Sequence, residues 1–310
     1  MDNLPVIAIR FALYADLMVL AGMAAFTLYA FTAPERTASS LIPLRPIVLV
    51  LALLGLILSG LGLLALAAEM MGASLFPVDP IHVRMILFET AIGSAWIVRM
   101  LALVIVLAAA LALERLPTAT RIAVVLASSG AIATLVWTGH AGATEGVWGT
   151  IHRLSDIVHM LGASIWVGGI ASFAWLLFRP AEKTSPTELA ITHRALEQFS
   201  QIGTLIVGLI VLTGLINSQI LVGAANIGMI ATTPYGQLLL AKLALFGLML
   251  ALAAANRWRL APALDAGIAS GNPFVAVIAL RKSLVAEGAA VFLILGLVAW
   301  LGTLEPPMSM

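Results

Sequence analysis

The chain has 310 residues, of which 62% are hydrophobic and only 10% are charged, and its mean hydropathy is +1.09. A soluble domain carries about 25% charged residues, so the charges here are too few to cover a water-facing surface, and a soluble globular protein is excluded. The net charge of +1 gives no reason to expect a nucleic-acid partner. The chain contains no cysteine, which excludes disulfides, thiolate metal sites and a thiol nucleophile.

A transmembrane helix needs about 20 mostly apolar residues, and eight segments of the chain meet this requirement. In chain order they lie near residues 6–31, 44–69, 91–113, 121–140, 151–177, 199–223, 236–257 and 282–303. The first segment is interrupted by Arg10 and Asp16 but is long enough to span, so we interpret it as a retained helix and not as a cleaved signal. The sequence does not decide whether a separate interfacial helix leads into the third segment. These features predict an all-α integral membrane protein, a bundle of eight transmembrane helices that forms a single domain over residues 1–310.

Lysine and arginine are unevenly divided between the two sides of this predicted bundle. One set of loops holds 11 of the 16 basic residues: Arg36, Arg45, Arg115, Arg121, Arg179, Lys183, Arg194, Arg257, Arg259, Arg281 and Lys282. The other side, with the spans that open from it, holds the remaining five: Arg10, Arg84, Arg99, Arg153 and Lys242. Because cytoplasmic loops carry an excess of these residues, we expect both termini to lie outside, which for a bacterial inner membrane is the periplasm.

Ionisable side chains inside the spans are costly to bury in lipid and are therefore functional candidates. Most of them fall in the outer half of their spans: Asp16, Arg99, Asp156, His159 and Lys242. The inner half holds little beyond Glu287. This asymmetry predicts a polar cavity that opens outward and is closed below by apolar packing. The alternative is a set of structural ion pairs, such as one between Asp16 and Arg99.

Histidine and methionine gather at the same outer boundary. The histidines there are His82, His140, His152 and His159, and the methionines proposed as ligands are Met70, Met71, Met308 and Met310. Imidazole and thioether groups suit copper, thioether being the soft ligand for Cu(I), so the sequence predicts a copper site with the metal as Cu(I) or Cu(II). The alternatives are that methionine fills gaps in an apolar protein and that His82 is an exposed interfacial residue.

The segment 138–170 carries the most informative pattern. His152, Asp156 and His159 fall on one face of a helix, and the two histidines are separated by about 10 Å along its axis, too far to chelate one ion by themselves. Asp156 can orient one imidazole, or the histidines can be successive stations for a moving ion, with His140 completing one of them. A polar seam between packed helices is the alternative to both.

This segment resembles a known family. Gly139-His140-Ala141, then His152 and His159, then Trp166-Val167-Gly168-Gly169 are similar to the core signature of the copper-resistance protein D family. Further matching residues are Gly93, Trp96, Arg99, Tyr235, Gly236, Lys242, Asn256, Arg257, Arg281, Ser283, Leu284, Glu287, Pro306 and Pro307. The resemblance covers nearly the whole chain and implies eight spans.

The resemblance also implies a function. Members of the family are inner-membrane copper homeostasis proteins, proposed to take copper from a small periplasmic carrier of the copper-resistance C type and to move it inward. By this likeness His140, His152 and His159 are the copper-associated positions. The carrier domain that is fused to some relatives is missing here, so a separate carrier protein is an expected partner, together with the copper ion and the lipid bilayer.

Other function classes stay open at this point. A b-type haem electron carrier could use His140 and His159 as axial ligands on neighbouring spans, and a purely structural membrane subunit needs no ligand. An enzyme is not expected, because the sequence has neither a Walker glycine loop nor an HExxH motif.

Overall fold

The computed structural model describes residues 4–37, 41–71, 80–179 and 185–309, and their regular structure is entirely helical. Eight helices in this part of the chain are long and apolar enough to cross a membrane. They are α1 (Leu4–Ala30), α3 (Leu44–Met71), α5 (Ala91–Leu111), α6 (Pro117–Ala133) with the 3-10 turn η1 (Thr134–Thr138), α8 (Gly146–Leu177), α9 (Pro186–Leu221), α10 (Pro234–Ala255) and α12 (Phe274–Leu301). The prediction of an all-helical protein with eight long apolar helices is confirmed.

Shorter helices connect these long ones. They are α2 (Ala33–Thr37), α4 (Pro80–Glu89), α7 (His140–Ala143), η3 (Ala224–Met229), the π-helical turn η4 (Asn256–Leu260), α11 (Ala261–Ala269) and η5 (Pro307–Ser309). A separate short helix, α4, therefore does precede the third span, a point that the sequence did not decide.

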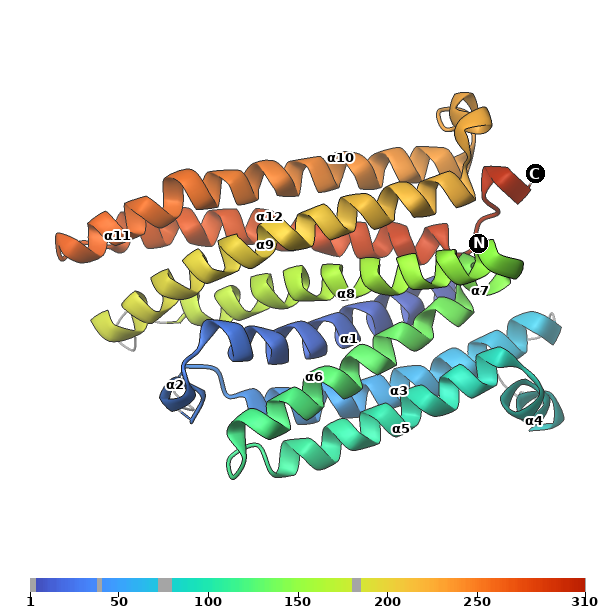
Figure 1. The fold of residues 1–310 in the computed structure, drawn as a ribbon, viewed down its shortest axis with the longest axis horizontal. Coiled ribbons are helices and arrows are strands. Elements are labelled where there is room, and N and C mark those ends of the chain that lie inside the picture. Colours follow the sequence, from blue (N-terminus) through green and yellow to red (C-terminus); the bar gives the residue numbers. More distant parts are fainter. Residues whose placement is uncertain (1–3, 38–40, 72–79, 180–184, 310) are drawn as a thin grey trace.

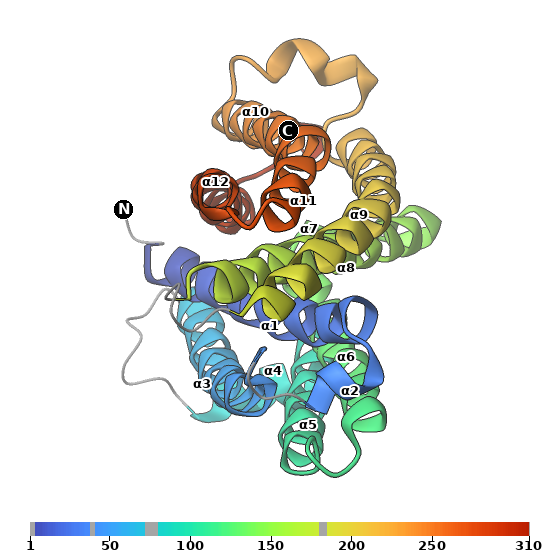
Figure 2. The ribbon, with the colours of Figure 1, turned by 90° about the vertical axis from the view of Figure 1, so that its left-hand side faces the viewer.

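The long helices form three layers, with α1 and α8 in the middle (Figures 1 and 2). Helices α3, α5 and α6 cover one side of this central pair, and α9, α10 and α12 lie on the other. Helix α1 contacts α3, α6, α8 and α12, so it joins the two halves of the chain. Outward-facing side chains such as Leu101 and Val104 of α5 are more than half exposed, as expected of a surface that faces lipid.

A close approach of two backbones fixes the central pair. A Cβ atom added to Gly22 of α1 would lie 2.7 Å from Cα of Gly168 on α8, and closer still to the carbonyl oxygen of Ser164. Only glycine leaves room for such an approach, which is how small residues promote helix packing in membranes. Further along both helices, Phe26 of α1 packs edge-on against Phe173 of α8, with ring centroids 5.0 Å apart.

Several predicted helix starts are wrong in the same direction. Helix α9 begins at Pro186 and not near 199, α12 at Phe274 and not near 282, and α8 at Gly146 and not near 151. The missed first turns of α9 are polar, and hydropathy reports the apolar part of a helix, not its polar ends. In α12 the missed residues are apolar and precede the basic pair Arg281 and Lys282, at which the predicted span begins. The true start of α9 has a capping box, in which Ser185 and Glu188 each accept a hydrogen bond from the other's backbone N–H.

The two ends of the bundle differ in what they carry. We call the end that holds α7 and residues 301–309 the α7 end, and the opposite end, with α2 and α11, the α11 end (Figure 1). Both ends of the chain lie at the α7 end, as an even number of spans requires. Ion pairs join Arg45 to Glu114 and Arg194 to Glu35 at the α11 end, with N–O distances of 3.0 and 2.5 Å.

The ion pair between Asp16 and Arg99 that the sequence offered as an alternative does not form. Both carboxylate oxygens of Asp16 are buried without a hydrogen-bond partner, as are Nε and Nη1 of Arg99. The carboxylate of Asp16 points at α3, because a Cβ atom on Gly55 would lie 2.8 Å from its Oδ2. Helical register alone placed these two charges at similar depth, but it did not determine which neighbours they face.

Candidate functional site

His140 begins α7, directly after the extended residue Gly139, and lies against the end of α12. Its Nε2 is 3.1 Å from the carbonyl oxygen of Leu301, and its ring centroid is 6.0 Å from that of Tyr235 on α10. Burial, together with the nearby charge of Arg10, lowers the pKa of His140 below its ordinary value of 6.5, although the hydrogen bond to Leu301 opposes this shift. The ring is therefore neutral at pH 7, with Nε2–H donating to Leu301 and a lone pair left on Nδ1.

His152 is only 2% exposed and is held by the loop that follows α7. Its Nδ1 is 2.9 Å from Oγ1 of Thr144, and the same hydroxyl donates to the backbone carbonyl of His140 at 3.1 Å. A hydroxyl has one hydrogen to donate, so with that hydrogen on the carbonyl it must accept from Nδ1–H of His152. The lone pair of His152 is then on Nε2, where a metal can bind.

His159 is oriented in the same way by a threonine of a different helix. Its Nδ1 is 3.0 Å from Oγ1 of Thr213 on α9, and that hydroxyl donates to the carbonyl of Leu209 at 2.6 Å. By the same argument Nδ1–H donates to Thr213 and Nε2 carries the lone pair. Fixing the tautomer through the nitrogen that does not bind the metal is the usual arrangement around metal-ligating histidines.

Asp156 does not orient either imidazole, so that sequence hypothesis is wrong. Its Oδ1 accepts from Nδ2 of Asn217 on α9 at 3.3 Å. Lys242 and Tyr235 of α10 interact electrostatically with its carboxylate, without a salt-bridge contact to Lys242 in the described part of the chain. Asp156 therefore supplies negative charge between the two histidines, while threonine hydroxyls position the rings.

These groups do not form a closed metal cage. Among the described residues, no three His, Asp or Glu side chains come together in a way that could hold one metal ion. His152 and His159 are seven residues apart on α8, which is about 10 Å along the helix axis. The arrangement offers two imidazole nitrogens in sequence along one helix, which suits passing an ion along better than storing it.

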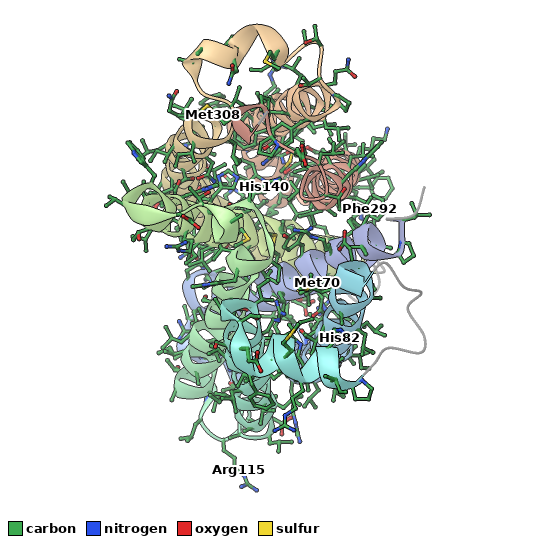
Figure 3. All side chains as sticks on the ribbon, turned by 90° about the vertical axis from the view of Figure 1, so that its right-hand side faces the viewer. Met70, His82, Arg115, His140, Phe292 and Met308 are labelled. Atoms are coloured by element: carbon green, nitrogen blue, oxygen red, sulfur yellow. The ribbon has the colours of Figure 1, made fainter. Side chains whose placement is uncertain are left out.

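The other predicted ligands divide into two groups at the α7 end. Figure 3, which looks onto this end, shows His140 and Met308 in the upper part of the bundle and Met70 and His82 in the lower part. Met70, on α3, is 60% exposed, and His82 lies on α4. The structure therefore does not bring these two residues to the histidines of α7 and α8.

Met308 lies beside the loop that follows α9. Its sulfur is 3.6 Å from Nδ2 of Asn226, and a Cβ atom on Gly223 would lie 2.8 Å from the same sulfur. The side chain of Met308 is 57% exposed. Met310 and the side chain of Met71 lie outside the described residues.

Sequence reasoning missed the two threonines that orient the rings. Thr144 is four residues after His140, and Thr213 is four residues before Asn217. Neither spacing reveals a histidine partner, because both contacts join segments that are distant along the chain or separated by a loop.

The expectation that the inner half is closed by apolar packing is also wrong. A cavity of about 670 Å³ opens at the α11 end between α8, α9, α10, η4, α11 and α12. Polar groups that line it include His193, Glu197, Asn256, Arg257 and Glu287. His193 and Glu197 lie in the first turns of α9, outside the predicted span, and the sequence pattern does not show that they face Asn256, Arg257 and Glu287.

The fold and the site together define a class: a multi-pass, membrane-type helical bundle with oriented imidazoles at one end. Comparison with known proteins then gives the family. Residues 1–150 match the family model for the N-terminal domain of copper resistance protein D-like proteins, and residues 193–301 match that for copper resistance protein D. His140 lies in the first match, and His152, Asp156 and His159 lie between the two.

Individual relatives agree with these family models. The chain is 41% identical over 306 residues to a copper resistance protein D of Pseudomonas syringae pv. tomato, covering 98% of this chain and 97% of the relative. It is 30% identical over 303 residues to the inner membrane protein YebZ of Escherichia coli (strain K12), covering 97% and 98%. Similarity to the copper transport protein CutJ of Bacillus subtilis (strain 168) is 32% over 185 residues, 57% of this chain and 32% of CutJ. No solved structure matches the chain. The chain belongs to the copper resistance protein D family.

Proposed function

We propose that the protein binds copper at the α7 end of its bundle, receives it from a separate periplasmic carrier of the copper-resistance C type, and passes it inward through a bacterial inner membrane. Copper is cargo in this proposal, and no catalytic chemistry is required of the protein. The relatives support the metal and the membrane, since their names describe copper resistance, copper transport and an inner membrane protein.

The observation that carries the proposal is the matched orientation of His152 and His159. Each ring donates Nδ1–H to a threonine hydroxyl and keeps Nε2 for a ligand. Metal binding requires neutral imidazoles, and the carboxylate of Asp156 between them favours a cation. Because few ligands are available at each position, an ion is held weakly enough to leave, as conduction requires.

The basic residues support the orientation. Eleven of the 16 lysines and arginines fall in the predicted loops on one side, and loops rich in these residues are typically cytoplasmic. This supports an orientation with the α7 end and both termini in the periplasm, where a carrier protein would dock.

The test uses His152→Gln and His159→Gln, singly and together, with His193→Gln at the α11 end as the matched control. We expect the double variant, as purified protein, to bind copper at least about tenfold more weakly, since loss of even an outer hydrogen-bond partner of a metal ligand lowers metal affinity 10–100-fold. We also expect it to lower the copper content of cells grown with added copper. If the double variant and His193→Gln both match the wild type in binding and in cellular copper, the proposal is refuted.

The haem alternative is decided by the same purified sample. A sharp visible absorption band that disappears in His140→Gln or His159→Gln would favour an electron carrier, and the copper proposal expects no such sharp band.

A further inference from the structure

A second polar site lies at the opposite end of the bundle from the copper histidines. The cavity of about 670 Å³ at the α11 end has exposed Glu197 and Asp265 among its lining residues, while Glu287 of α12, only 3% exposed, lies in its wall. Aromatic side chains, among them Trp166 and Trp258, also line the cavity. Because burying a carboxylate at a membrane-spanning position is costly, Glu287 needs a physical reason to be there.

Both hydrogen bonds to Glu287 reach the same oxygen. Its Oε1 accepts from Nδ2 of Asn256 at 2.5 Å and from Oγ of Ser283 at 3.1 Å. No hydrogen bond to Oε2 and no ion pair of Glu287 occurs among the residues that the structure describes.

The arginines next to this cluster are committed to other partners. Arg257 of η4 donates to Oγ1 of Thr204 at 2.7 Å, and Arg281 of α12 donates to the carbonyl of Leu177 at 2.6 Å and to that of Arg179. The charged or titratable groups that line the cavity or adjoin Glu287 are His193, Glu197, Arg257, Asp265, Arg281 and Lys282. The negative charge of Glu287 is therefore not balanced by a described cationic side chain.

Two further buried atoms around the cavity lack partners. Oδ1 of Asn256 is buried without a hydrogen bond, and so is Nε1 of Trp166, whose side chain is 4% exposed. Asn256 is the first residue of the π-helical turn η4, and such turns occur frequently at functional sites. Since nearly all buried polar groups in proteins have partners, the oxygen of Asn256 beside Glu287 indicates a missing ligand.

The chemistry of these atoms selects the ligand. Carboxylate, amide and hydroxyl oxygens suit hard cations, whereas copper prefers imidazole and sulfur ligands. One carboxylate balances one positive charge, and Ca²⁺ would need six to eight oxygen ligands. We propose that Glu287, Asn256 and Ser283 form a binding site for a monovalent cation, a proton or a sodium ion, that is reached through the cavity at the α11 end. This site is independent of the copper function proposed above.

The purified full-length protein in detergent provides the test. Trp166 and Trp258 line the cavity, so tryptophan fluorescence is read while sodium chloride replaces choline chloride at constant ionic strength. A saturable sodium response that is kept in Glu197→Gln and lost in Glu287→Gln supports a sodium site. Proton binding is measured by potentiometric titration in choline chloride above about pH 6, where ordinary exposed carboxyl groups are already ionised. In that range, one fewer proton bound by Glu287→Gln than by Glu197→Gln, without a sodium response, supports a proton site.

A second variant keeps the test decisive if Glu287→Gln does not fold. Asn256→Ala retains the carboxylate but removes the unpartnered oxygen, and we expect it to weaken sodium affinity by about tenfold or more, or to shift the pH at which the proton binds. Absence of any sodium response in the wild type, combined with identical proton binding in all folded variants, overturns the proposal.

Discussion

Gly22→Ala tests whether the contact between α1 and α8 holds the two halves of the bundle together. The added Cβ would lie 2.7 Å from Cα of Gly168 and still closer to the carbonyl oxygen of Ser164. Carbon atoms pack best at about 3.5–4.0 Å, so the two backbones must separate by about 1 Å. No side chain can rotate away to relieve the contact, because both neighbours are backbone atoms.

Overpacking of this kind costs about 1–3 kcal/mol, and occasionally more. We expect Gly22→Ala to reach the upper end, about 3 kcal/mol, because both contacting groups are backbone atoms within regular helices. The same displacement moves α8, which carries His152 and His159, relative to Thr213 on α9. Copper binding should therefore weaken along with stability.

The assay is unfolding of the purified protein, by heat or by titration with a denaturing detergent, followed by circular dichroism. Gly208→Ala on α9 is the matched control, because a Cβ atom there meets nothing within 4 Å. That control should be at least as stable as the wild type, since alanine favours helix more than glycine does. Equal unfolding midpoints for Gly22→Ala and Gly208→Ala would refute the proposed close contact.

Two further predictions concern the histidines. Thr213→Val should weaken copper binding by about 10–100-fold, because it leaves Nδ1–H of His159 without its acceptor. Thr192→Val, on the same helix, is the control and should not weaken binding, because the Thr192 hydroxyl donates to the carbonyl of Glu188 and not to a histidine. Equal copper affinities of the two variants in a competition titration would contradict the assigned tautomer. Burial lowers the pKa of His140, so the unfolded state takes up the proton first and stability is lost as the pH falls from 6.5 through the lower native pKa. His140→Gln should flatten this part of the curve of unfolding midpoint against pH, and an unchanged slope would show that His140 does not titrate as inferred.

The sequence by itself determined the eight apolar helices and the end at which the histidines gather. Both follow from one constraint, because a lipid-facing helix must be apolar over about 20 residues and polar groups are then confined to a few positions. The spacing of His152 and His159 along α8 follows equally from helix geometry. Hydropathy could not find the polar first turns of α9, because helical structure continues beyond the apolar span.

Only the tertiary structure decided how the helices face one another. In a membrane both the lipid and the protein core are apolar, so hydrophobic pattern carries little information on rotation or neighbours. For that reason the sequence could not show that Thr144 and Thr213 orient the rings or that Asp16 and Arg99 do not pair. It also could not show the cavity around Glu287, because residues of α8, α9, α10 and α12 meet there only after the bundle has assembled.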